Sequence, residues 1–338
     1  MKKSWILAIV CVVVAVVLPQ VITNAYFIQI LFSTALYAFL ASSWNIVGGF
    51  AGQLGIGNGL YFGLGVYLTI ALFCTADISP WIGLIIAGLI TGAISLLLGF
   101  ATFSLRTAYY GLATVALLNI LRIVFNENAK MFGLDFGGSA GLRVKWKGDF
   151  ASMQFTSKLP YFYIVLAMLI GVLLLTNYIS KSKFGFYLMA INTNALAASS
   201  LGVKVMTYKI YAQFLTAFLM ALGGGVYGIF IMYVDPQTIF SFQISFNIML
   251  MAVFGGRGTV FGPLIGAIVL MPMYEIFRLN FSMTMPGLPM ALFGLMLMLC
   301  MQFMPNGIVD VGKKLIKKYR HAAQTKAGAV VEGGDANG

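Results

Sequence analysis

Charged residues are scarce in this 338-residue chain. Only 9% of its residues are Asp, Glu, Lys or Arg, whereas a soluble domain carries roughly 25%. Hydrophobic residues make up 60% of the chain, and its mean hydropathy is +0.94. Because so few charges cannot cover the surface of a soluble protein of this size, the composition predicts an all-α polytopic membrane protein.

Residues that bind metals or form disulfides are also rare. Cys11, Cys74 and Cys300 fall inside or at the edge of apolar segments, so they predict no disulfide framework. The chain has one histidine, His321, and no clustered set of metal ligands. It lacks the GxxxxGK[ST] phosphate-binding pattern and any recognisable nucleophile–base set. We therefore expect no cofactor, no enzyme activity and no ATP hydrolysis by this chain itself.

The net charge of +12 needs a separate explanation. A basic chain can bind nucleic acid, but here the basic residues stand at the ends of apolar segments. In that position Lys and Arg set membrane orientation and contact anionic lipid headgroups. Membrane lipid is therefore an expected partner, and nucleic acid is not.

Apolar segments of membrane-spanning length recur along the chain. The first could be a signal peptide, but its apolar run is longer than a signal core and no clear small-residue cleavage site follows. We therefore predict a retained helix there, and about ten crossings in total, some short or broken. The predicted segments are residues 5–22, 27–47, 60–76, 81–104, 108–126, 160–180, 209–232, 240–255, 262–278 and 286–304.

The basic residues predict the orientation of these segments. With ten crossings, the side that holds both termini carries 14 of the 21 basic residues and three of the nine acidic ones, a net charge of +11. The other side carries seven basic and six acidic residues, a net charge of +1. Since Lys and Arg concentrate on the cytoplasmic side, both termini are predicted to be cytoplasmic. Arg122 and an i,i+3 pair of Glu275 with Arg278 fall near the outer ends of their spans.

Residues 45–69 are unusually rich in glycine. Eight glycines lie between positions 48 and 65. Such density at membrane depth indicates either close helix packing or a broken helix beside a transport pathway. Gln53 and Asn58 are its polar members, and with Gly57 and Gly59 they are the candidate pathway residues.

Two longer polar stretches divide the membrane domain, predicted at residues 1–312. Residues 127–159 form an expected external loop, and residues 181–209 form a basic cytoplasmic loop without an acid. Within the second stretch, Asn194 can cap a short helix, Ala195 to Leu201 favour helix, and Gly202 can end it in a left-handed conformation. An ordinary loop is the alternative. Residues 313–338 are predicted to be a basic, partly disordered cytoplasmic tail.

Four stretches together resemble the permease subunits of branched-chain amino acid ABC importers, in particular the longer of the two sister permeases. The resemblance spans most of the chain. Its residues are GGFAGQLGIGNGLYFGLGVYLT (48–69), LRTAYYGLATVALLNILRIV (105–124) with GGSAGL (137–142), SKFGFYLMAINTNALAASSLGVKVMTYK (182–209), and VFGGRGTVFGPLIGA (253–267) with MPNGIVD (304–310).

The resemblance implies a transport subunit of a prokaryotic inner (plasma) membrane, moving branched-chain or other hydrophobic amino acids inward. Its implied partners are a sister permease, two ATP-binding cassette subunits and an external substrate-binding protein. The third stretch resembles the coupling helix that docks into the ATPase. The coupling residues that it implies here are Asn192, Asn194, Leu196, Ala197, Ala198, Leu201 and Gly202.

The chain departs from the family at several of these positions. Asn58 stands where relatives usually have histidine. Asn192, Thr193, Ala195 and Ser199 replace residues that are usually charged. Docking would then depend on packing by small and apolar side chains.

Other functions stay open at this stage. The same machinery serves urea, short amides and other small neutral solutes. A secondary transporter or channel acting alone would need ionisable residues within its spans, and mid-span positions here hold almost none. A structural membrane scaffold would not need a docking loop of helix size.

Overall fold

The computed structural model describes residues 24–105, 107–131 and 133–281, with a few isolated positions at 19–20 and between 287 and 308. The predicted first span (5–22), the tenth span (286–304) and the tail (313–338) lie essentially outside these described residues. The number of ten crossings and the cytoplasmic termini therefore stay predictions.

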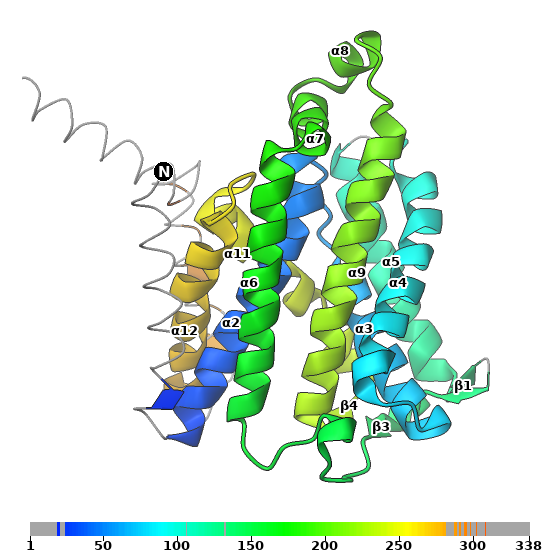
Figure 1. The fold of residues 1–338 in the computed structure, drawn as a ribbon, viewed down its shortest axis with the longest axis vertical. Helices are drawn as coiled ribbons and strands as arrows, with labels where there is room; N and C mark the ends of the chain where they lie inside the picture. The colour runs from blue at the N-terminus through cyan, green and yellow to red at the C-terminus, as the bar shows by residue number, and fades with distance from the viewer. Residues whose placement is uncertain are drawn as a thin grey trace, which may run out of the picture.

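The described residues form a bundle of long helices, which confirms an all-α polytopic fold (Figure 1). Within the described residues, seven helical segments are long and apolar enough to cross a membrane. An eighth long helix, α12, contains Pro272. Together they match the eight predicted spans between residues 27 and 278. The long helices are α2 (Ala25–Asn45), α3 (Gly59–Ala76), α4 (Pro80–Thr102), α5 (Thr107–Glu127), α6 (Leu159–Lys181), α9 (Val205–Ile231), α11 (Phe242–Gly256) and α12 (Gly262–Phe281).

Helices α2, α3, α9 and α11 form the interior of the bundle, and α4, α5 and α6 lie at its periphery. The sequence of α4 explains its position. One face carries glycines, and Gly88 and Gly92 meet the rings of Phe218 and Phe214 on α9. The opposite face exposes apolar side chains, most of them large, as expected for contact with lipid tails. Those residues are Ile82, Ile85, Leu89, Ile90, Leu97 and Phe100.

Short strands close the end of the bundle that is predicted to be external. The hairpin of β1 (Lys130–Met131) with β2 (Leu134–Asp135) lies in the loop after α5. Strand β3 (Leu142–Arg143) pairs antiparallel with β4 (Tyr233–Val234), which joins this loop to the end of α9. Short 3-10 helices lie at Gly138–Ala140 and Phe150–Ser152, and the single α-turn α10 (Pro236–Ile239) precedes α11.

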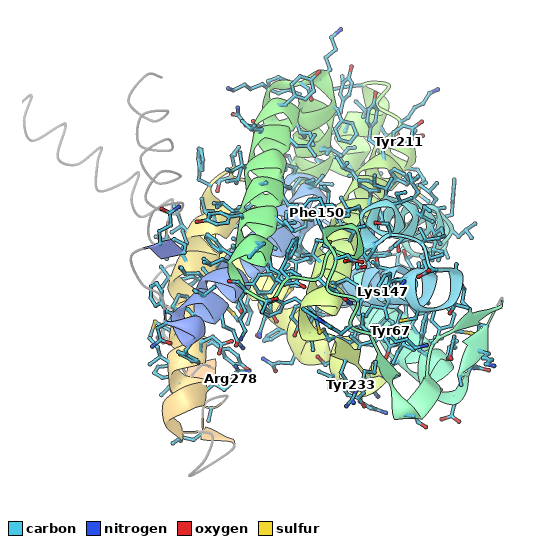
Figure 2. The ribbon with its side chains drawn as sticks, turned by 60° about the horizontal axis from the view of Figure 1, so that its bottom comes forward. Tyr67, Lys147, Phe150, Tyr211, Tyr233 and Arg278 are labelled. Atoms are coloured by element: carbon cyan, nitrogen blue, oxygen red, sulfur yellow. The ribbon has the colours of Figure 1, made fainter. Side chains whose placement is uncertain are left out.

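Side-chain contacts attach this loop to the bundle. Lys147 forms an ion pair with Asp77 at the end of α3. Trp81 Nε1 donates a hydrogen bond of 3.0 Å to the Phe150 carbonyl, and the two rings stack. Figure 2 turns this end toward the viewer and labels Lys147, Phe150 and Tyr233. The loop is therefore a folded surface and not an unstructured connection.

The basic stretch 181–209 lies at the opposite end of the bundle (Figure 1). It contains two helices, α7 (Lys183–Thr193) and α8 (Ala195–Ser200). The two polar stretches therefore lie on opposite sides, as the predicted topology requires. The predicted pair of Glu275 with Arg278 is also confirmed, with 2.8 Å between Glu275 Oε2 and Arg278 Nη2.

Candidate functional site

Helix α8 is built by its own capping residues. Asn194 has an extended backbone, and its Oδ1 accepts a hydrogen bond of 3.0 Å from the Ala197 N–H. Helix α8 ends at Ser200, and Gly202 follows its C-cap with a φ of +87°, which suits glycine. The Gly202 N–H donates to the Ser199 carbonyl at 2.9 Å. The predicted short helix, its N-cap Asn194 and the left-handed Gly202 are confirmed, while its docking role stays a prediction.

The exposed side of α8 carries an apolar group next to two exposed serines, Ser199 and Ser200. Leu196 is 82% exposed and Leu201 is 86% exposed, and Ala197 lies exposed beside them. Ala198 was expected on the same surface, but it is only 3% exposed and faces the interior of its own chain. The reason is the helical repeat of about 100° per residue, which turns Ala198 to the side opposite Leu196. Leu201 follows the last helical residue as the C-cap. We refer to Leu196, Ala197 and Leu201 as the α8 knob.

Helix α7 was not predicted, and Asn192 belongs to its last turn and not to α8. Ser182 caps α7 by accepting from the Gly185 N–H at 3.3 Å. Its buried residues are Gly185, Leu188 and Ile191, spaced three apart. That spacing, together with Ser182, is the sequence signal from which α7 could have been found.

The glycine-rich stretch is a broken helix. Helix α2 runs into a π-helical turn at Ile46–Phe50, residues 51–58 are irregular, and α3 begins at Gly59. The break is confirmed, and the glycines also permit close packing, while a transport pathway beside the break stays a prediction. A Cβ on Gly57 would collide with the Thr114 backbone, and a Cβ on Gly59 would collide with the Ser245 hydroxyl.

Side chains from surrounding helices hold the broken segment in place. Trp44 Nε1 donates to the Gly55 carbonyl at 2.8 Å. The Gly57 N–H donates to Thr114 Oγ1 on α5, and the Gly59 N–H donates to Ser245 Oγ on α11, each at 3.0 Å. These three residues were missed by sequence reasoning. Each of them is a single residue with a polar atom in an apolar span. Such a residue does not indicate which backbone group its side chain contacts.

A second contact joins the break to the glycine-rich turn after α11. Asn45 is fully buried, and its Nδ2 donates to the Thr259 carbonyl at 2.9 Å. Its Oδ1 accepts from the Gly258 N–H at 2.8 Å. One buried amide therefore fixes two stretches that lie more than 200 residues apart in the sequence.

Asn58 and Gln53 are buried in the break without this kind of support. Asn58 is 1% exposed, and within the described residues neither its Oδ1 nor its Nδ2 has a hydrogen-bond partner. The same is true of Gln53 Oε1 and of Gln213 Nε2 on α9. Gln213 Oε1 accepts from Tyr110 at 3.1 Å. An unpartnered buried polar atom costs about 1–3 kcal/mol, so these amide atoms favour binding a water molecule or a polar ligand.

The two candidate sites adjoin at Asn192. Its Nδ2 donates to the Gly49 carbonyl at 3.0 Å, in the π-helical turn before the break. The α8 knob, Asn192 and the break are therefore linked through residues next to one another. In the described residues no group of three His, Cys, Asp or Glu side chains is placed to hold a metal ion.

Comparisons with known proteins identify the family. Residues 26–301 match the family model described as the permease component of the branched-chain amino acid transport system. The chain is 26% identical to the high-affinity branched-chain amino acid transport system permease protein LivM of Escherichia coli, covering 95% of this chain and 79% of that protein. A probable LivM of Methanocaldococcus jannaschii is 23% identical, covering 74% and 78% respectively.

A more distant relative is the ribose import permease protein RbsC of Bacillus subtilis. It is 28% identical over 47% of this chain and 48% of its own length. No solved structure matches the chain. Because the family model covers most of the chain and the fold is a multi-pass helical bundle, this protein belongs to the permease components of the branched-chain amino acid transport systems of the prokaryotic inner membrane.

Proposed function

We propose that this chain moves branched-chain or other hydrophobic amino acids inward, powered by two separate ATP-binding cassette subunits that dock on the α8 knob. The knob is the observation that carries the proposal. Two leucines more than 80% exposed on a capped helix beyond the ends of the spans are costly in water. A hydrophobic groove on a partner would bury them, as in other helix-in-groove contacts.

The buried amides support a neutral cargo. Gln53, Asn58 and Gln213 contribute polar atoms to the interior but no net charge. A full charge at membrane depth costs about 2.5–3.5 kcal/mol or more without a partner. A zwitterionic amino acid has no net charge, and its polar ends can be met by amide donors and acceptors. A small amide such as urea is the second cargo class.

Pairing with a sister permease is supported by α5. Of the seven candidate spans, α5 is both the least hydrophobic and the least covered by its own chain. Asn119 and Arg122 lie half-buried on one flank of it. Polar groups in such a position are unfavourable toward lipid tails and favourable against a second subunit or an aqueous pathway.

An external substrate-binding protein is the remaining proposed partner. At the external end, Trp146 is 53% exposed and Phe150 is 72% exposed, and Tyr233 lies exposed on the same end of the molecule (Figure 2). Exposed aromatic residues are enriched where proteins contact one another. This surface is where we propose that the binding protein delivers its cargo.

The docking proposal is tested by Ala197→Asp. In the isolated chain Ala197 is exposed, so the change should alter folding stability by about 0.5 kcal/mol or less. At a docked contact the same change would bury an unpaired charge, which costs several kcal/mol. We expect the variant to reach the membrane normally while copurification of the ATPase subunits and their stimulation by the binding protein are lost.

Thr207→Asp is the matched control. Thr207 is exposed in the first turn of α9, near the same end of the bundle but outside the α8 knob. It adds the same charge, at a helix start where an acidic residue is favourable. Wild-type copurification and stimulation in the Ala197→Asp variant would contradict docking on α8, as would equal losses in both variants.

A further inference from the structure

The side chain of Asn192 connects the docking region to the broken helix by a hydrogen bond. It lies in the last turn of α7, two residues before the N-cap of α8. Its Nδ2 donates a 3.0 Å hydrogen bond to the Gly49 carbonyl, 143 residues away in the sequence. Regular helical hydrogen bonding ends at this turn, so a side chain from another helix caps its carbonyl.

The surrounding backbone is shaped for this side chain. Gly52 has a φ of +72°, and a Cβ at that position would collide with Asn192 Oδ1. The chain therefore turns around the amide, which donates to Gly49 on one side and packs on Gly52 on the other.

The hydrogen bond between Asn192 and Gly49 is connected through the backbone to the α8 knob on one side and to the buried amides on the other. Toward the α8 knob, residues 192–194 pass from α7 into α8, and the side chain of Asn194 caps α8. Toward the interior, the π-helical turn leads into residues 51–58, which end at Asn58. Trp44 and Thr114 hold that segment at Gly55 and Gly57. A displacement of α7 and α8 would therefore pull on the backbone of the break.

We infer that Asn192 is a positioning residue that transmits movement from the α8 knob to the broken helix, and through it to the buried amides. The inference rests on the proposed function, since it needs an ATPase docked on α8. It assigns to Asn192 a task inside its own chain and not a contact with the ATPase. Docking and transmission are then separable by mutation.

The decisive variant is Asn192→Asp in the complex with its ATPase subunits and binding protein. Aspartate keeps the shape of the side chain but removes the donor and points a carboxylate oxygen at the Gly49 carbonyl. We expect normal copurification of the ATPase and normal basal ATP hydrolysis. Stimulation of hydrolysis by the binding protein, and tritiated-leucine uptake per ATP hydrolysed, should each fall about tenfold, which corresponds to one net hydrogen bond of about 1.4 kcal/mol.

Asn192→Ala and Thr193→Ala complete the set. Asn192→Ala removes the donor without adding charge and should show the same loss. Thr193 is the next residue and is exposed like Asn192, and its hydroxyl donates within α7, to the Met189 carbonyl at 3.0 Å. Thr193→Ala should behave as wild type. A purely structural hydrogen bond would lower the amount of membrane protein without changing uptake per ATP.

Three results would overturn the inference. The first is wild-type stimulation and uptake per ATP in either Asn192 variant. The second is loss of ATPase copurification in the Asn192 variants, which would make Asn192 part of the docking contact itself. The third is a Thr193→Ala variant as impaired as Asn192→Ala. If leucine is not a cargo, the wild type fails in uptake, which contradicts the proposed function, and the stimulation assay alone decides on Asn192.

Discussion

Replacing each of two buried asparagines at the broken helix should change the stability of the protein in opposite directions. Asn45 is fully buried with both side-chain atoms hydrogen-bonded, to Thr259 and Gly258. Asn58 is 1% exposed, and within the described residues neither amide atom has a partner. Leucine has the same branched shape as asparagine without its polar atoms. Asn45→Leu and Asn58→Leu therefore form a matched pair.

The expected effects follow from these contacts. Asn58→Leu removes two unpartnered atoms that each cost about 1–3 kcal/mol, and a swap of similar volume costs less than about 1.5 kcal/mol. We expect a net gain in stability of about 1 kcal/mol or more. Asn45→Leu leaves two backbone groups without their partner, at about 1–3 kcal/mol each, so we expect a loss of about 2–6 kcal/mol.

The assay compares stability with transport. Thermal unfolding of the purified complex in detergent, followed by tryptophan fluorescence, should show a higher midpoint for Asn58→Leu and a lower one for Asn45→Leu. Transport should fall in the more stable Asn58→Leu variant, because the polar atoms that destabilise the fold are those proposed to meet the cargo. If Asn58→Leu destabilises the protein as much as Asn45→Leu, or transports normally, the reasoning is refuted.

Two further predictions concern the ion pair and the topology. Arg278→Ala should lower stability by about 3 kcal/mol in the same thermal assay, because it leaves the carboxylate of Glu275, 4% exposed, without its partner; a change under about 0.5 kcal/mol would contradict a stabilising pair. A cysteine introduced at Ala140 should react with an impermeant thiol reagent on intact cells, and one at Ala322 should not. The reverse pattern would contradict the orientation, and labelling of both from outside would contradict the even number of crossings.

The fold was largely predictable because its spans are long and apolar. Eight predicted segments match helices, since hydropathy acts over some 20 residues and averages out local exceptions. The cap of α8 was predictable for the opposite reason. Asn194 and Gly202 act on backbone groups of residues next to them in the sequence, so their effect can be predicted from the local sequence.

The contacts of the candidate site were less predictable because they join distant parts of the chain. Nothing near Asn192 indicates Gly49, and nothing near Thr114 indicates Gly57. The glycines marked a place of close packing or a break, but not what approaches them. The error at Ala198 has a local cause, since a list of consecutive small and apolar residues takes no account of which face of the helix each one occupies.

The central claim is that this chain transports a neutral amino acid only when separate ATPase subunits drive it. The most direct measurement is uptake of tritiated leucine into proteoliposomes that contain the purified complex, with the binding protein and ATP supplied on the appropriate sides. We predict uptake that requires ATP and the ATPase subunits, and that excess isoleucine suppresses but arginine or ribose does not. Equal uptake by this chain alone in response to an ion gradient, or preferential transport of arginine or ribose by the complex, would contradict the account.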